Sequence, residues 1–206
     1  MTPHDHGPLA EEQLRYRVKG ELRKRMRGLR KTLPASACAE RSARITATLW
    51  AHDALAHAER AALFWPNEER HEVDLRRLDA LLRARGASVA YPGVDAETGA
   101  MTFRFVRDPQ TMVEQGKGFR EPSPQETAAR PGELDVIVVP ALAVDPTGHR
   151  LGYGGGHYDR ALPAFAPPAI TIGVAFDFQL LAEIPFTAGD VPMAWLVTDA
   201  RALRAE

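Results

Sequence analysis

The sequence predicts an α/β fold with a single doubly wound, mostly parallel sheet that has helices on both faces. Two observations lead to this prediction. Short runs of almost entirely apolar residues alternate with helical patterns along the chain, which is typical of parallel strands covered on both faces. The chain also contains no internal repeat and no low-complexity tract, so residues 1–206 are expected to form one domain.

Four stretches are expected to be helical. The first, over 14–34, has apolar residues at helical spacing and ends at Pro34, and residues 1–12 before it are expected to be disordered. Its apolar positions are Leu14, Val18, Leu22, Met26 and Leu29. The other helices are expected over 35–58, 72–86 and 157–162.

Apolar runs mark the expected strands, which are 60–66, 88–92, 101–106, 133–145, 169–176 and 194–200. The run over 133–145 is the most apolar and is predicted to be central, whereas the alternating run over 101–106 suits an edge. The proline-containing segment over 108–131 is expected to be a loop near a site. The result is a Rossmann-like three-layer sandwich, in which ligands bind beyond the carboxyl ends of the strands.

Composition excludes several classes of protein. No run of about 18 apolar residues occurs, and the first residues lack the basic and apolar regions of an export signal, so the chain is expected to be cytoplasmic without a membrane partner. The single cysteine, Cys38, can form neither an internal disulfide nor a zinc cluster. The histidines are scattered without ligand spacing, so no zinc site is expected.

Basic residues are concentrated near the amino terminus. Nine of the 26 lysines and arginines lie between Leu14 and Lys31, where Glu21 is the only acidic residue. Such a face could contact nucleic acid or simply be solvated. Because no interleaved aromatic and basic residues extend it, nucleic acid is not expected to be a partner.

The segment over 150–160, "RLGYGGGHYDR", has four glycines in five positions. It matches neither a Walker loop nor the dinucleotide fingerprint, because His157 and Tyr158 follow the last glycine. Its bare backbone still offers N–H groups to a phosphate, Arg150 adds a guanidinium, and Asp159 could hold a Mg²⁺ that bridges phosphate oxygens. The alternative is a tight turn capped by Asp159.

Lysine is rare in this chain, and Lys19 is one of only four. Lys19 and Arg23 are four residues apart and share one helix face, so they could bind a polyphosphate tail. The alternative is an ordinary solvated face.

The stretch "VVPALAVDPTGHRLGYGGGHYDRAL" resembles the signature of the 5-formyltetrahydrofolate cyclo-ligases, also called 5,10-methenyltetrahydrofolate synthetases. "KGELR", "HEVDL", "GFREP" and "GDVPMAWLVTD" resemble further family segments in the right order, so that the resemblance covers nearly the whole chain. It implies an ATP- and Mg²⁺-dependent closure of 5-formyltetrahydrofolate to 5,10-methenyltetrahydrofolate, with ADP and phosphate as the other products. The formyl oxygen would first take the γ-phosphoryl group, and nitrogen 10 would then attack the activated carbon.

The resemblance also implies residue roles. Lys19 and Arg150 would be the catalytic cations, Asp159 and Asp190 would ligate Mg²⁺, and Glu72 would bind the folate. ATP would be bound by Lys19, Arg23, Arg150, Leu151, Gly152, Tyr153, Gly154, Gly155, Gly156, His157 and Tyr158. The folate would also contact Tyr153, Gly154, Gly155, Gly156 and His157. The protein would then act on small molecules as a monomer.

Other interpretations of these residues stay open. Glu72 could be a carboxylate at a helix amino terminus, and Asp190 could form a turn. His157 stands where the family usually has tyrosine, Leu75 replaces a threonine, and Gly189 stands where many members have histidine. The alternative functions are a phosphosugar isomerase or acyl-transferase on a related fold, and a nucleotide or folate binder without turnover.

Overall fold

A computed structural model describes residues 8–115 and 119–206. The helices are α1 (Pro8–Lys31), α2 (Ala35–Trp50), α3 (Asp53–Ala56), α4 (Arg76–Ala84) and α5 (His157–Ala161), with short 3₁₀ turns η1 (Glu68–Arg70), η2 (Pro109–Thr111), η3 (Leu162–Ala164) and η4 (Asp177–Gln179). The strands are β1 (Arg60–Ala62), β2 (Ser88–Val94), β3 (Met101–Phe105), β4 (Val113–Glu114), β5 (Arg120–Glu121), β6 (Val136–Pro140), β7 (Ala143–Val144), β8 (Arg150–Leu151), β9 (Ile170–Val174), β10 (Trp195–Val197) and β11 (Ala202–Arg204).

The central sheet has seven strands in the order β11-β10-β9-β6-β1-β2-β3. Neighbouring strands from β10 to β2 are parallel, and the edge strands β3 and β11 are antiparallel to their neighbours. The predicted α/β class is therefore confirmed. The apolar strand β6 is central and β3 is at an edge, as predicted, whereas β11 was not expected.

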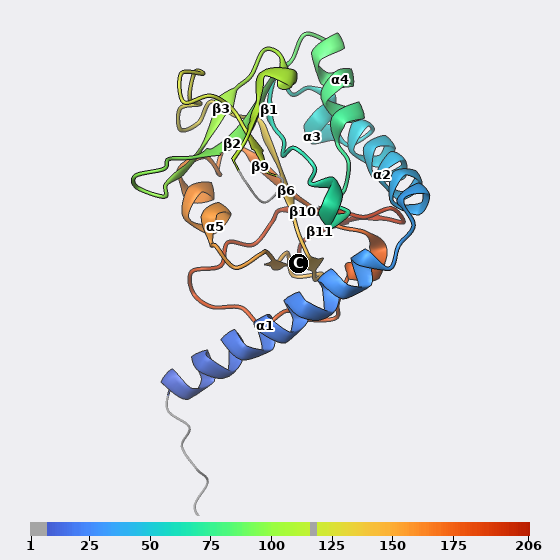
Figure 1. Cartoon of the computed structure of the whole chain (residues 1–206), viewed down its shortest axis with the longest axis vertical. Helices are drawn as coiled ribbons and strands as arrows, with labels where there is room; N and C mark the ends of the chain where they lie inside the picture. Colours follow the sequence, from blue (N-terminus) through green and yellow to red (C-terminus); the bar gives the residue numbers. More distant parts are fainter. Residues whose placement is uncertain (1–7, 116–118) are drawn as a thin grey trace, which may run out of the picture.

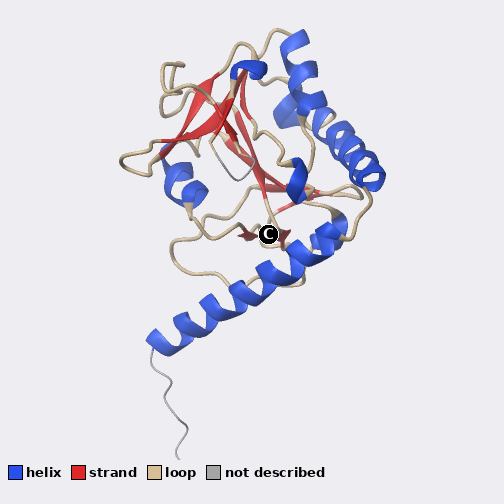
Figure 2. Ribbon diagram, viewed as in Figure 1, coloured by secondary structure: helices blue, strands red, loops and turns tan. Residues whose placement is uncertain are grey.

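Helices cover the sheet unequally on its two faces (Figures 1 and 2). On one face, α2, α3 and α4 contribute Ile45, Leu55 and Leu82 to a core that includes Val89 and Val138. On the other face, the short α5, η3 and the residue that follows η3 pack Tyr158, Leu162 and Phe165 against Phe103 and Ile137. The sandwich therefore has one thick helical layer and one thin layer.

Helix boundaries differ from the predictions where a local turn replaces part of the expected helix. The helix expected over 35–58 breaks after Trp50, because the His52 side chain accepts a hydrogen bond from Ala54 N (3.1 Å) and starts α3. The helix expected over 72–86 begins at Arg76, because residues 67–72 close a separate turn. Its end is as expected, since Gly86 follows with a φ of 91°.

Two strand predictions are also corrected. The stretch 133–145 is not one strand. The pairing of β6 with β9 ends at Pro140, and the chain then forms the hairpin of β7 and β8. The glycine loop therefore follows β8 and not the central strand directly. The segment 108–131 has regular structure after all, since β4 pairs with β5 and Glu121 Oε2 accepts a hydrogen bond from Val94 N (2.9 Å).

Helix α1 lies beside the sheet, across the hairpin of β7 and β8 (Figure 1). It begins at Pro8, so residues 8–12, which were expected to be disordered, are helical; residues 1–7 lie outside the described residues. Of the expected apolar face, Met26 is buried, but Leu14, Val18 and Leu29 are exposed. Lys19 and Arg30 are buried instead, so the inward face of α1 is partly cationic.

No helix within the described ranges is both long enough and apolar enough to cross a membrane. The single domain over 1–206 stays a prediction.

Candidate active site

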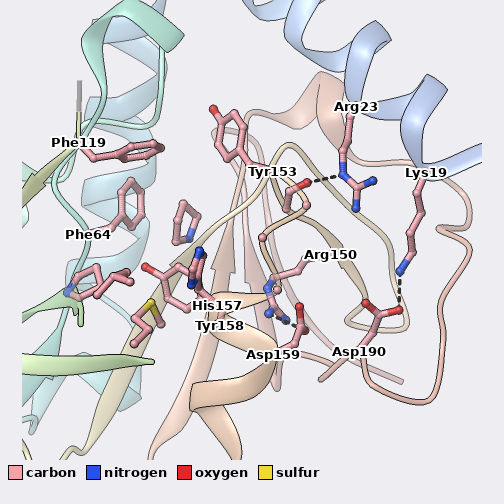
Figure 3. Close-up of a pocket in the computed structure, with 18 of the residues that line it drawn as sticks. Lys19, Arg23, Phe64, Phe119, Arg150, Tyr153, His157, Tyr158, Asp159 and Asp190 are labelled. Carbon is pink, nitrogen blue, oxygen red and sulfur yellow. Dashed lines mark hydrogen bonds and ion pairs between the residues drawn. The ribbon is translucent and has the colours of Figure 1, made fainter. Parts of the chain in front are cut away.

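A cavity of about 450 Å³ lies beyond the carboxyl ends of β1, β2 and β6, where ligands bind in parallel α/β sheets. Its walls differ in chemistry (Figure 3). One wall, formed by α1, the glycine loop and the segment before β10, carries charged and polar side chains, which are Lys19, Arg23, Arg150, Asp159, Thr187 and Asp190. The opposite wall is mainly apolar and consists of Phe64, Trp65, Pro92, Val94, Met101, Phe119 and Pro140.

Lys19 and Asp190 form a nearly buried ion pair on the charged wall. Lys19 Nζ lies 2.5 Å from Asp190 Oδ2, and the same oxygen accepts hydrogen bonds from Thr187 N (2.6 Å) and Thr187 Oγ1 (3.0 Å). Burial acts to raise the pKa of Asp190, but the hydrogen bonds from Lys19 and Thr187 outweigh it, so the pKa lies below its usual value. Asp190 therefore stays ionised and holds Lys19 in the cavity wall.

Arg150 is paired with the second carboxylate of this wall. Its Nη2 donates to Asp159 Oδ1 (2.7 Å), its Nη1 donates to Val191 O (2.6 Å), and Val191 N donates back to the same Asp159 oxygen (3.1 Å). Arg150 is 8% exposed, and these hydrogen bonds fix the orientation of its guanidinium. Both predicted catalytic cations are thus paired with the two predicted metal ligands.

The glycine loop turns its carbonyl groups toward arginines. Gly152 O accepts a hydrogen bond from Arg23 Nε (2.9 Å), and Gly155 O accepts one from Arg160 Nη1 (2.9 Å). Within the described residues, the N–H groups of Gly154, Gly155 and Gly156 donate no hydrogen bond. Gly154 and Gly156 have positive φ values of 104° and 64°, which glycine can adopt because it has no Cβ. Free amides beside guanidinium groups form a site suited to an anion.

Glu72, Tyr153 and Tyr158 also line the cavity. Glu72 Oε2 accepts a hydrogen bond from Asn67 N (3.0 Å), and the side chain lines the cavity. Burial, followed by the charge of Glu72, raises the pKa of Tyr153 and of Tyr158. The buried Tyr158 hydroxyl has no hydrogen-bond partner among the described residues. These phenols are therefore neutral donors beside a carboxylate.

His157 also faces the cavity (Figure 3). Its ring lies over Gly155, where an added Cβ would come within 2.8 Å of His157 Nε2. Arg160 Nη2 lies 3.4 Å from His157 Nδ1. The imidazole is thus fixed between the glycine loop and Arg160.

The carboxylates can be compared with what Mg²⁺ requires. Among residues 8–115 and 119–206, no group of three or more His, Cys, Asp or Glu side chains could hold a metal by itself. Each carboxylate does keep one oxygen, Asp159 Oδ2 and Asp190 Oδ1, that makes no hydrogen bond within these ranges. Mg²⁺ usually takes one or two protein carboxylates and completes its shell with water and substrate phosphates, so this donor set fits.

The cavity brings together almost all the residues singled out in the sequence. They are Lys19, Arg23, Glu72, Arg150, Gly152, Tyr153, Gly154, Gly155, Gly156, His157, Tyr158, Asp159 and Asp190. Leu151 is the exception, because its side chain packs with Met26 and Leu142 in a separate core cluster. Their individual roles stay predictions.

The apolar wall was not predicted from the sequence. Phe64 and Trp65 lie just beyond the end of β1, after Leu63, and Pro140 ends β6. The rule that ligands bind beyond the strand ends could therefore have identified them. Phe119 lies in the quoted "GFREP" segment, to which no role was given. Its ring stacks with Arg70, whose Cζ is 4.4 Å from the Phe119 centroid and 4.7 Å from that of Tyr153.

Comparison with known proteins gives consistent matches. A sequence model of the 5-formyltetrahydrofolate cyclo-ligase family matches residues 15–199. The 5-formyltetrahydrofolate cyclo-ligase of Mycolicibacterium smegmatis is 48% identical over 98 residues, which cover 47% of this chain and 50% of that protein. The Escherichia coli protein of the same name is 39% identical over 69 residues, covering 33% and 38%. In the matched segments, the chain thus covers half or less of the length of each of these two relatives.

Two solved structures resemble the whole fold. The 5,10-methenyltetrahydrofolate synthetase of Aquifex aeolicus has a TM-score of 0.78 at 29% identity, covering 91% of this chain and 92% of that one. The Mycoplasma pneumoniae 5,10-methenyltetrahydrofolate synthetase has a TM-score of 0.71 at 22% identity, covering 88% and 98%, which supports the fold alone.

Proposed function

This chain belongs to the 5-formyltetrahydrofolate cyclo-ligase family, and we propose that it catalyses the ATP- and Mg²⁺-dependent closure of 5-formyltetrahydrofolate to 5,10-methenyltetrahydrofolate. The observation that carries the proposal is the cavity itself. One side is a cationic wall with backbone amides that donate no hydrogen bond to the described part of the chain, and the other side is an aromatic wall near the Glu72 carboxylate. Such a cavity suits a polyphosphate placed against a fused-ring substrate.

The charged wall would receive the triphosphate. Lys19 and Arg150 are nearly buried, at 7% and 8% exposure, so their charges act through little water. Arg23 uses only Nε on Gly152 O among the described residues, which leaves its Nη groups for phosphate oxygens. Phosphoryl transfer asks a protein mainly for positioning and charge neutralisation, and these groups provide both.

Asp159 and Asp190 would hold Mg²⁺ through the oxygen that each keeps without a hydrogen bond from the residues that the structure describes. When bound there, the ion would neutralise charge that develops on the phosphate oxygens. The same carboxylates already orient Arg150 and Lys19, so loss of either one would affect a cation as well.

The apolar wall and Glu72 would bind the folate. Phe64, Trp65 and Phe119 offer flat apolar surfaces to its rings, and the Glu72 carboxylate can accept hydrogen bonds from ring N–H groups. Held there, the formyl oxygen would face the γ-phosphate. It would attack phosphorus with ADP leaving. Nitrogen 10 would then attack the formyl carbon, phosphate would leave as its bond to that carbon breaks, and the proton of nitrogen 10 would pass to the departing phosphate. No protein nucleophile is needed.

The test is an absorbance assay with purified protein, Mg²⁺, ATP and 5-formyltetrahydrofolate. The methenyl product absorbs in the near ultraviolet where the substrate does not, so a rise that requires ATP supports the proposal. Absence of any rise at saturating substrates would refute it. Turnover of phosphosugars or acyl donors without ATP would favour the isomerase or transferase alternative, and binding of both ligands without product would favour a binder.

Small molecules are the expected partners. The monomeric state, the absence of a nucleic-acid partner and the cytoplasmic location stay predictions.

A further inference from the structure

The turn over 67–72 contains an unusual backbone conformation. His71 has φ 48° and ψ 47°, and it is the only residue other than glycine with a positive φ in the part of the chain that the structure describes. This left-handed region is unfavourable for a residue with a side chain, and it persists where surrounding contacts enforce it, often at functional sites. His71 directly precedes Glu72, which lines the cavity.

Two reciprocal hydrogen bonds tie His71 to helix α1. Arg30 Nε donates to His71 O (3.1 Å), and His71 Nδ1 lies 3.0 Å from Arg30 O. Because a carbonyl oxygen can only accept, the Nδ1 atom carries the proton. Arg30 is 3% exposed, so these bonds are shielded from water. The last turn of α1 thereby fixes a strained residue in another segment.

The turn closes on Glu72 itself. Glu72 N donates to Asn67 O (3.2 Å), and Asn67 N donates to Glu72 Oε2 (3.0 Å). The direction of the carboxylate therefore depends on the path of the turn. Glu72 is 7% exposed, and Oε2 is the carboxylate oxygen that accepts the hydrogen bond from Asn67 N. The other carboxylate oxygen of this cavity-lining residue, Oε1, can accept a hydrogen bond from a ligand N–H group.

We propose that His71, held by Arg30, is a positioning residue that aims Glu72 Oε1 at an N–H group of the folate. This inference rests on the proposed function. His71 does not touch the substrate and acts through Glu72. A change at His71 should therefore weaken folate binding while it leaves ATP binding unchanged, because the nucleotide wall lies on other elements.

Two variants separate the side-chain bond from the backbone conformation. His71→Gly tolerates the left-handed backbone and loses the donor, whereas His71→Asn tolerates it and keeps an amide N–H where Nδ1 stood. We expect His71→Gly to raise the KM for 5-formyltetrahydrofolate by about tenfold, with the KM for ATP within about twofold. His71→Asn should retain the wild-type KM for both.

A double-mutant cycle with Glu72→Gln tests whether His71 acts through Glu72. In the Glu72→Gln background, His71→Gly should have little further effect on the folate KM, because the group that it positions is already changed. Equal tenfold effects in both backgrounds, or a folate KM unchanged by His71→Gly in an active enzyme, would overturn the proposal.

Amide hydrogen exchange keeps the test independent of the proposed reaction. If the wild-type protein makes no product, the proposed function fails, and exchange at Glu72 N decides the positioning inference. Faster exchange confined to the 67–72 turn in His71→Gly, and not in His71→Asn, would support it. Unchanged exchange in both variants would refute it.

Discussion

The ammonium group of Lys19 lies 2.5 Å from Asp190 Oδ2, and this contact joins helix α1 to the segment before β10, 171 residues later in the sequence. Arg150 and Asp159 repeat the arrangement at 2.7 Å. Each cation is therefore oriented by a carboxylate that keeps one oxygen uncommitted within the described residues. A wall built in this way can offer cations to phosphate and carboxylates to a metal ion.

Lys19→Met should weaken ATP binding. A charged hydrogen bond to phosphate contributes about 1.5–3 kcal/mol, so the KM for ATP should rise roughly ten- to a hundredfold. Steady-state kinetics at saturating folate measure this. Lys24→Met is the matched control, because Lys24 is exposed on the same helix and does not line the cavity. Equal KM values in both variants would show that Lys19 is only a structural cation.

Asp190 should make stability depend on pH in the acid range. A carboxyl whose pKa is lower in the folded than in the unfolded protein stabilises the fold above its unfolded pKa of about 3.9. This contribution is lost as the pH falls through the lower, folded value. Asp190→Asn should therefore lower the Tm at pH 7, and the difference from wild type should shrink below about pH 4. Thermal denaturation across this range would contradict the assignment if the difference stayed constant.

Asp159→Asn should reduce turnover by about a hundredfold or more, because the variant keeps an acceptor for Arg150 but loses the negative charge offered to Mg²⁺. The Mg²⁺ concentration needed for half-maximal rate should rise in the same assay. Asp177→Asn serves as the control, since Asp177 pairs with Arg201 and does not line the cavity. Wild-type turnover in Asp159→Asn would remove this residue from the metal site.

Gly154→Ala should impair nucleotide binding more than stability. At φ 104° an alanine is strained by about 1–3 kcal/mol, and its Cβ would lie 3.5 Å from the Arg23 guanidinium. The contact with Arg23 is an ordinary van der Waals distance, so the backbone strain is what would displace the loop amides. Gly86→Ala is the matched control, because Gly86 has a similar φ of 91° with open space around it. The control should lose stability alone, as comparison of melting curves with ATP titrations would reveal; equal ATP affinity in the two variants would argue against an anion site in the loop.

Tyr91, Tyr153 and Tyr158 should resist ionisation at alkaline pH. Burial raises the pKa of each phenol, with a further contribution from Asp79 at Tyr91 and from Glu72 at the other two. A raised pKa in the folded state stabilises the fold below the ordinary value of about 10, and this contribution is lost above it. Spectrophotometric titration should show three phenols that ionise only together with unfolding. Ionisation of all four tyrosines of the chain in a folded protein would contradict this.

Much of the fold could be predicted because strands and helices produce local patterns of apolar residues in the sequence. The apolar run of β6 identified the central strand, and the alternation over 101–106 identified an edge. Errors arose where a local contact ended an element early. The His52 cap divides the second helix, and the closed turn over 67–72 delays the start of α4. Neither contact leaves a periodic signal.

Part of the candidate site could also be predicted, because some of its residues form a local sequence pattern. The four glycines in five positions can be identified from the sequence alone. They form the loop whose amide N–H groups donate no hydrogen bond among the described residues. Phe64 and Trp65 were predicted only as the end of a strand, because an apolar residue that lines a cavity cannot be distinguished in the sequence from one that is buried in the core. The left-handed His71 gave no sequence signal at all.

The sequence by itself determined the order of the elements, the glycine loop and the membership of a family. Only the tertiary structure decided which face of α1 turns inward. Apolar spacing favoured Leu14, Val18, Leu22, Met26 and Leu29. Of these five, Met26 is buried as predicted, but Leu14, Val18 and Leu29 are exposed, and Lys19 and Arg30 are buried. The reason is that Asp190 and the carbonyl of His71 compensate the buried cations. These partners lie 171 and 41 residues away, beyond the reach of any helical period.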